Sequence, residues 1–154
     1  MSETIRAYTF RVVLLGSANP SITRTFTLPA SSTFQHLHHA IQYSFDWQNS
    51  HLHEFTFEPT RTDGAAGVIS FDSPTVLMNV GMEKNQNNDE FMGGNSNSYF
   101  NEKKLKLSDI WEEDGKARKK VVRNGQVVSL YYLYDFGVSA HHSPFTQRFN
   151  WFII

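Results

Sequence analysis

Alternating apolar and polar positions predict a hairpin at the start of the chain. From Tyr8 to Leu15 the side chains on one face are apolar at every second position, which is the period of a half-buried strand. Residues 22–28 alternate in the same way, with threonines on one face and apolar side chains plus Arg24 on the other. Turn-forming residues fill positions 16–20, and Pro29 ends the second run. The pattern therefore predicts two paired strands.

The residues after the hairpin have the spacing of a helix. The segment 32–35 (Ser-Thr-Phe-Gln) fits a capping box, in which the Ser32 hydroxyl and the Gln35 side chain bond free backbone N–H groups. Apolar side chains then recur at helical spacing, whereas Gln42 falls outside that stripe. We therefore expect a helix over residues 32–45. Its inward stripe comprises Phe34, Leu37, His38, Ile41 and Phe45.

Alternation returns in residues 51–58, which we expect to form a third strand. One face of this strand would carry His51, His53, Phe55 and Phe57. Residues 59–104 have little periodicity, and the runs 85–88 and 93–98 consist only of Asn, Gln, Gly and Ser. We interpret this stretch as a long variable loop, partly mobile, within a single domain.

The C-terminal third predicts a short helix and three more strands. Residues 105–111 fit a helix with apolar side chains turned inward. Asn124-Gly125 between β-rich runs marks a two-residue type I′ turn, because both central residues need positive φ. This turn would join residues 119–123 to a long strand over 126–136, and a last strand would cover 145–154.

The expected fold is therefore α+β. The element order is ββαβ, a loop, a short helix and βββ, which predicts an antiparallel or mixed sheet of five to seven strands with the main helix packed on one face. A chain of 154 residues suits one domain, which we take as residues 1–154.

Composition narrows the classes of function. The chain has 13 Phe, 6 Tyr and 3 Trp, which suits either a dense core or an enclosed apolar site. A net charge of −1 lacks the basic excess of nucleic-acid-binding proteins. With no cysteine, disulfides and thiolate chemistry are excluded. No secretory signal or membrane-length apolar run is visible, so we expect a soluble cytoplasmic protein with no membrane partner.

Three segments carry a resemblance to a known family. They are Pro20–Pro29 (PSITRTFTLP), Ser50–Phe55 (SHLHEF) and Tyr134–Gly137 (YDFG), supported by Leu37-His38, Ile41-Gln42 and Phe45-Asp46-Trp47. Together they resemble the Ri-plasmid Orf-three-like family, whose name states no activity. The family's second signature continues as Asp, any residue, Trp, any residue, His. This chain has Val138 and Ala140 where the acid and the Trp would stand, and only His142 matches.

The two signatures supply the candidate site residues, which we expect to meet at one mouth of the sheet. Candidate acid–base or hydrogen-bonding residues are His51, His53, Tyr132, Asp135 and His142. Candidate substrate-contacting residues are Trp47, Phe55, Tyr134, His141 and Trp151. A structural interpretation competes with this one. Asp135 would then cap the turn at Gly137, and the histidines would anchor the sheet.

Metal and nucleic acid are the weaker alternatives. The spacing of His51, His53 and Glu58 is similar to the first cupin motif, but Glu58 has the opposite strand parity and no second motif follows. We therefore expect no metal and no cofactor, and a cupin-like metal enzyme is the weaker alternative. The basic run 116–120 is most simply a solvated hairpin edge, and we expect no nucleic-acid partner.

The favoured hypothesis is a cofactor-independent cyclase or isomerase. Holding a flexible apolar substrate in one conformer and offering a hydrogen-bond donor can accelerate a cyclisation, including an intramolecular Diels–Alder reaction. The substrate would be a hydrophobic small molecule, such as a terpenoid or polyketide intermediate of secondary metabolism. The alternative is a non-catalytic domain that binds a small molecule or a protein. The patterns leave the oligomeric state open.

Overall fold

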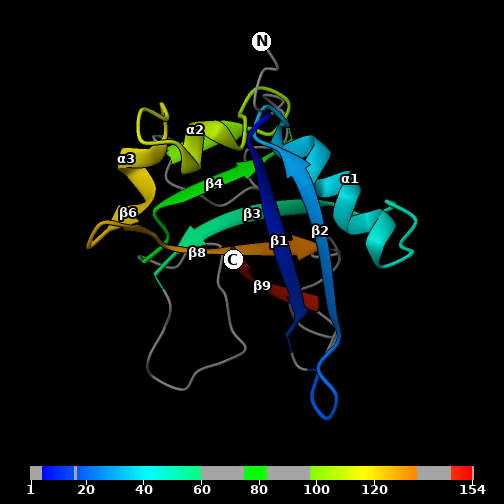
Figure 1. Cartoon of the computed structure of the whole chain (residues 1–154). Helices are drawn as coiled ribbons and strands as arrows, with labels where there is room; N and C mark the ends of the chain where they lie inside the picture. The colour runs from blue at the N-terminus through cyan, green and yellow to red at the C-terminus, as the bar shows by residue number, and fades with distance from the viewer. Residues whose placement is uncertain (1–4, 16, 60–74, 83–97, 135–146, 154) are drawn as a thin grey trace.

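The computed structural model describes residues 5–15, 17–59, 75–82, 98–134 and 147–153. Within them the chain forms a seven-stranded sheet, a separate two-stranded hairpin and three helices (Figure 1). The strands are β1 (Ala7–Leu14), β2 (Thr23–Pro29), β3 (His53–Glu58), β4 (Met78–Gly81), β5 (Tyr99–Asn101), β6 (Val122–Arg123), β7 (Gln126–Val127), β8 (Ser129–Tyr134) and β9 (Gln147–Ile153). The helices are α1 (Phe34–Ser44), α2 (Ser108–Trp111) and α3 (Arg118–Val121).

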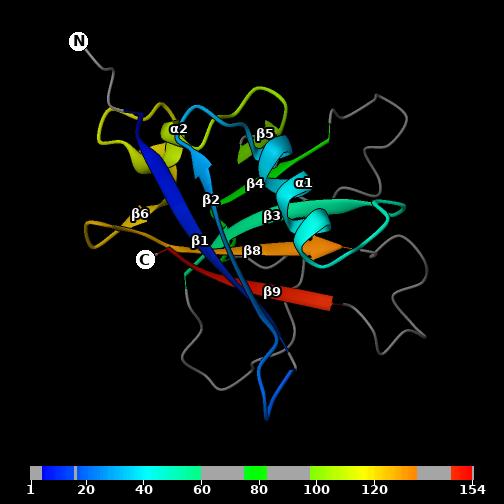
Figure 2. The ribbon, with the colours of Figure 1, turned by 45° about the vertical axis from the view of Figure 1, so that its right-hand side comes forward.

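The large sheet is mixed, and the last strand lies in its interior. The order is β2-β1-β9-β8-β3-β4-β5, and only β4 and β5 are parallel. Strand β9 pairs with β1 on one side and with β8 on the other, so it joins the N-terminal hairpin to the rest of the sheet (Figure 2). The expected α+β class, with a mixed sheet of seven strands, is confirmed.

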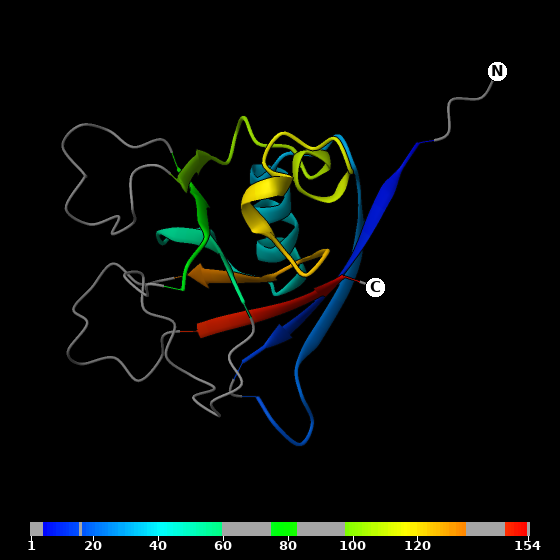
Figure 3. The same cartoon turned by 90° about the vertical axis from the view of Figure 1, so that its left-hand side faces the viewer.

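All three helices cover one face of this sheet (Figure 3). The core forms where α1 and the α2–α3 segment meet the inward side chains of β1, β3, β4 and β8. Its fully buried members include Phe10, Val12, Phe34, Leu37, Ile41, Phe55, Phe57, Val80, Ile110 and Tyr132. Burying each large apolar side chain contributes about 1.5–3 kcal/mol, so this layer dominates the stability of the fold. No helix in the described ranges is long and apolar enough to cross a membrane.

Helix α1 begins one residue later than the capping pattern predicts. Thr33 is the N-cap: its hydroxyl accepts the His36 N–H, and the His36 ring accepts the Thr33 N–H at 3.0 Å. The predicted roles of Ser32 and Gln35 are therefore wrong. The reason is tertiary, because the Gln35 N–H donates to the Glu102 carbonyl at 3.1 Å and needs no side-chain cap.

The described parts of the segment 59–104 contain strands that its composition does not predict. Strands β4 and β5 lie inside it, and every residue of β4 is buried. Strand β4 pairs with β3, and β5 adds to β4 in parallel. The polar runs 85–88 and 93–97 lie outside the described residues. Both strands are too short to show a period in the sequence.

The Asn124-Gly125 turn is confirmed, with φ of 52° and 77°. The strand predicted before it is mostly wrong, since residues 118–121 form helix α3 and only Val122 and Arg123 pair with the next strand. Ala117 and Val121 are both buried, four residues apart, which is helical spacing. The basic run thus lies on a helical turn rather than on a hairpin edge.

Candidate functional site

A hydrogen-bond network links helix α1 to strand β8 through buried polar side chains. The Tyr132 hydroxyl lies 2.7 Å from His38 Nδ1 and 2.8 Å from Gln42 Nε2. Because the Gln42 amide can only donate, the Tyr132 hydroxyl donates to His38 Nδ1. His38 Nε2 then donates to Asn49 Oδ1 at 2.6 Å, and the Asn49 N–H donates to Gln42 Oε1 at 3.0 Å. Four residues thus satisfy one another.

A histidine–carboxylate pair lies beside this network. His53 Nε2 is 2.6 Å from Glu102 Oε2, and the two residues are 3% and 2% exposed. His53 is the first residue of β3, while Glu102 follows β5 and donates its backbone N–H to the Gly81 carbonyl. The other ring nitrogen, His53 Nδ1, is buried and makes no hydrogen bond with any described residue.

The His38 and His53 rings are stacked, with centroids 3.5 Å apart and planes 8° apart. Burial, and to a smaller extent the neighbouring His53, lower the pKa of His38 to about 4, against an opposing contribution from the Asn49 hydrogen bond. His38 is therefore neutral near pH 7, which fits its role as one donor and one acceptor. Burial also raises the pKa of the Tyr132 phenol, so that group stays protonated.

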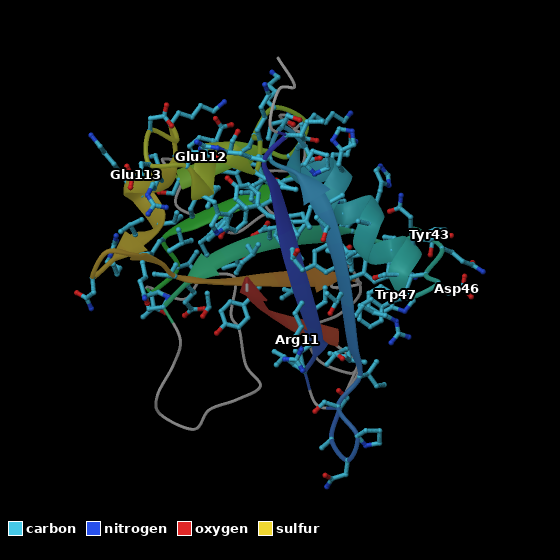
Figure 4. The ribbon with its side chains drawn as sticks, viewed as in Figure 1. Arg11, Tyr43, Asp46, Trp47, Glu112 and Glu113 are labelled. Atoms are coloured by element: carbon cyan, nitrogen blue, oxygen red, sulfur yellow. The ribbon has the colours of Figure 1, made fainter. Side chains whose placement is uncertain are left out.

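Aromatic side chains gather at the end of β8 nearest this pair. Trp47 stacks on Tyr134 at 5.1 Å, and His51 meets the same ring edge-on at 5.5 Å. The Tyr134 hydroxyl accepts the Ser50 N–H at 3.0 Å. Tyr134 pairs with His53 in the β3–β8 register, so this cluster adjoins the His53–Glu102 pair. Trp47 lies just past the C-terminal end of α1 (Figure 4).

The structure brings six of the ten predicted site residues into one region. These are His53, Phe55 and Tyr132 inside the core, and Trp47, His51 and Tyr134 at its end. Asp135, His141 and His142 lie outside the described residues. Trp151 on β9 pairs with Leu130 on β8. Leu130 is four residues from Tyr134, so the backbone of Trp151 lies roughly 13 Å from the Tyr134 end of β8.

The predicted arrangement of the two histidines is wrong. Strand β3 begins at His53, so His51 precedes it, and His51 is exposed whereas His53 is buried. The two imidazoles therefore do not share a strand face, which removes the basis of the cupin-like alternative. Within the described ranges, no group of three or more His, Cys, Asp or Glu side chains is arranged to hold a metal ion.

Four members of this region were missing from the sequence prediction as site residues: His38, Gln42, Asn49 and Glu102. His38 and Gln42 are four residues apart, so a polar pair on the inward stripe was the available signal. The apolar spacing predicts that Gln42 lies outside the stripe, which is wrong, because its side chain is only 3% exposed. Glu102 lies in a stretch without periodicity, and nothing in its local sequence indicates a buried carboxylate.

Comparison with known proteins identifies the family. The family model described as plasmid pRiA4b ORF-3-like protein matches residues 6–144. The chain belongs to this family. The resemblance seen in the two signatures is thereby confirmed. No curated protein matches the chain.

One solved crystal structure has the same fold as this pRiA4b ORF-3-like chain. It is a crystal structure of MM3350, a protein of unknown function from Methanosarcina mazei Go1, with a TM-score of 0.58 and 24% sequence identity. The match covers 96% of this chain and 58% of the other, so this chain spans little more than half of that protein's length.

Proposed function

We propose that the protein is a cofactor-independent isomerase or cyclase that acts on a hydrophobic small molecule. The observation that carries the proposal is the buried His53–Glu102 pair, in which one imidazole nitrogen bonds a carboxylate while the other makes no hydrogen bond with a described residue. Buried polar atoms without a partner are uncommon and often mark sites of chemistry.

The pair supports proton transfer. Glu102 accepts the hydrogen bond of His53 Nε2–H, which fixes the ring tautomer and leaves a lone pair on Nδ1. An imidazole held in this way can take a proton from one carbon of a substrate and return it to another. The double bond moves, no atom is gained or lost, and no cofactor is needed. Glu102 acts as a positioning residue in this scheme.

The surroundings favour an apolar substrate. The ring of Phe55 lies 6.3 Å from that of His53, edge to face, and Phe34 packs on Phe55 at 5.3 Å. Trp47 and Tyr134 continue the aromatic wall toward the end of the sheet. A terpenoid or polyketide intermediate of secondary metabolism has the matching character. Cyclisation, including a Diels–Alder reaction, would use the same confinement together with a donor hydrogen bond.

Substrate entry requires a local opening. His53 Nδ1 is closed to solvent. The connection of residues 45–52 packs against Tyr134 at this end of the core through Trp47 and Ser50. Asn49 holds that connection to His38 and Gln42 by the hydrogen bonds described above. We place the opening here, because six of the eight connection residues (46 and 48–52) are exposed and few contacts hold the connection to the core.

The same proposal places the protein in the cytoplasm and gives it no membrane or nucleic-acid partner. The nearly balanced charge, 14 basic against 15 acidic side chains, supports the absence of a nucleic-acid partner.

A second function, a non-catalytic binding domain, is favoured by one observation. The Tyr132 hydroxyl is fully engaged by His38 and Gln42, so it is not free to donate to a substrate. A network in which each member satisfies the next stabilises a fold without any chemistry.

Native mass spectrometry of the full chain with a library of lipophilic metabolites separates the two functions. For an isomerase or cyclase, a compound is bound, and its chromatographic retention changes at unchanged mass. This change is lost in His53→Asn and kept in His39→Asn, because His39 is an exposed histidine of helix α1. A compound that is retained but never altered supports the binding domain. No retained compound contradicts both.

A further inference from the structure

Strand β2 forms one edge of the seven-stranded sheet and, among the described strands, pairs only with β1 (Figure 1). At one end of this pair the Leu14 N–H donates to the Ile22 carbonyl at 2.9 Å. At the other end the Ala30 N–H donates to the Arg6 carbonyl at 2.8 Å. Backbone groups alternate in direction along an antiparallel strand, so the even-numbered residues of β2 bond to β1. The odd-numbered residues therefore direct their N–H and C=O groups away from the sheet.

The odd-numbered residues of β2 are Thr23, Thr25, Thr27 and Pro29. Thr25 and Thr27 are exposed, and their backbone N–H and C=O groups make no hydrogen bond with any described residue. The Thr23 carbonyl accepts the Arg24 guanidinium at 2.9 Å and keeps a second lone pair. A row of unpaired backbone groups on a sheet edge is a template for another strand.

Strand β2 has few of the features that protect an edge from pairing. Lysines, a proline within the strand or a bulge usually provide that protection. Strand β2 contains no lysine, its proline is the last residue, and its register with β1 is unbroken over seven residues. The one charged side chain of β2, Arg24, is turned to helix α1, where its Nε donates to the Ser44 carbonyl at 2.8 Å. The edge is thus open to a partner strand.

The sequence of β2 is complementary to itself in the antiparallel direction. A twofold axis at Thr25 places this residue opposite its copy and places Thr23 opposite Thr27 of the second copy. Each of these pairs exchanges two backbone hydrogen bonds, and threonine opposite threonine is a favourable cross-strand pair. On the other face of the strands, Arg24 lies opposite Phe26 of the second copy, which places a cation beside an aromatic ring.

The two neighbouring registers are less favourable. An axis at Arg24 places two guanidinium groups directly opposite each other, and like charges in that position are destabilising. An axis at Phe26 places Thr23 opposite Pro29, which has no N–H to donate. The Pro29 carbonyl already accepts the Ser32 N–H at 3.0 Å. Charge and backbone chemistry therefore select a single register for the pairing of β2 with itself.

We propose that two copies of this chain pair through β2 in the antiparallel direction about a twofold axis at Thr25, which joins their two large sheets into one. The same surface of both copies forms the interface, as in most homodimers. Because the interface is one pair of strands, the dimer is weak and reversible. In the sheet order β1, β9 and β8 lie between β2 and β3, so the dimer does not depend on the isomerase proposal.

Sedimentation equilibrium of the full chain tests for this dimer. The protein is measured in a series from about 1 μM to about 1 mM, which covers the dissociation constants of weak complexes. We expect the average mass to rise reversibly with concentration, from the mass of one chain toward that of two. A mass that stays at one chain throughout the series overturns the proposal.

Charged substitutions at residue 25 test the position of the axis. In Thr25→Lys the two substituted side chains meet at the axis with like charge, and in Thr25→Glu they do so with the opposite sign. Each variant alone should associate about fivefold more weakly than the wild type or worse. An equimolar mixture of the two variants should dimerise again, because opposite charges then meet. Thr25 is exposed, so both variants should stay folded, which circular dichroism checks.

The matched controls are Gln126→Lys and Gln126→Glu, at an exposed residue of the separate β6–β7 hairpin. They carry the same changes of net charge and should dimerise as the wild type does. Dimerisation of both Thr25 variants at the wild-type affinity would place the interface elsewhere and overturn the proposal. A mixture of the two that associates no better than either variant alone would contradict the axis at Thr25.

Discussion

The imidazole rings of His38 and His53 lie face to face, 3.5 Å apart at their centroids. Each ring has its own polar partners: His38 bonds Tyr132 and Asn49, and His53 bonds Glu102. Two stacked, buried imidazole rings are disfavoured from carrying a positive charge at the same time, because like charges repel at this distance. Burial, and to a smaller extent this contact, keep His38 neutral. The hydrogen bonds of His38 tie helix α1 to strand β8 and to the 45–52 connection.

The first prediction concerns the pH dependence of stability. The pKa of His38 falls from 6.5 to about 4 on folding. Below pH 6.5 the unfolded chain takes up a proton that the folded chain refuses, so stability is lost as the pH falls from about 6.5 to about 4. The loss is on the order of 3 kcal/mol, because one pKa unit corresponds to about 1.4 kcal/mol. Urea denaturation at pH 7, 5.5 and 4 measures it.

The variant His38→Asn isolates this contribution from that of the carboxylates, which also titrate in this range. Its free energy of unfolding should be lower at pH 7 and should fall less between pH 7 and pH 4 than that of the wild type. Identical pH dependence of the two proteins would show that His38 is not held neutral.

The second prediction concerns the Tyr132 hydroxyl. Tyr132→Phe removes the group that both His38 Nδ1 and Gln42 Nε2 contact, and leaves two buried polar atoms unsatisfied. The free energy of unfolding should fall by about 2–4 kcal/mol. Tyr43→Phe is the matched control, since Tyr43 is 90% exposed and should change stability little. Equal stability of the two variants would contradict the network.

The third prediction concerns the approach of Tyr99 to Gly81. Gly81→Ala would place a Cβ against the Tyr99 hydroxyl and displace it from the Met82 carbonyl. We expect a loss of about 1–3 kcal/mol in the free energy of unfolding. In a Tyr99→Phe background the added methyl should cost less, with a coupling of at least about 0.5 kcal/mol. A double-mutant cycle by chemical denaturation measures this coupling, and strictly additive effects would contradict the contact.

Local periodicity was enough to predict the elements that carry most of the core. The β1–β2 hairpin, α1 and the Asn124-Gly125 turn all follow from side-chain spacing or from a required backbone conformation. The position of β9 between β1 and β8 does not, because a strand's partners depend on contacts distant in the chain.

The candidate site was only partly predictable for the same reason. His53 and Tyr132 lie in segments with clear strand patterns, so both were identified. Glu102 is 49 residues from His53 in the sequence and follows a strand of three residues. No period can be seen over so short an element, and the pairing exists only because β5 adds to the edge of β4.

The most direct test of the proposed function is the turnover of an identified substrate by Glu102→Gln. This substitution keeps the size of the side chain and its ability to accept from His53 Nε2–H, but removes the negative charge of the carboxylate that positions the ring. The matched control is Glu113→Gln, an exposed carboxylate of the α2–α3 connection (Figure 4). The account predicts that kcat falls by about a hundredfold in Glu102→Gln, with KM little changed, and that the control is unaffected. Equal kcat in the two variants would contradict it.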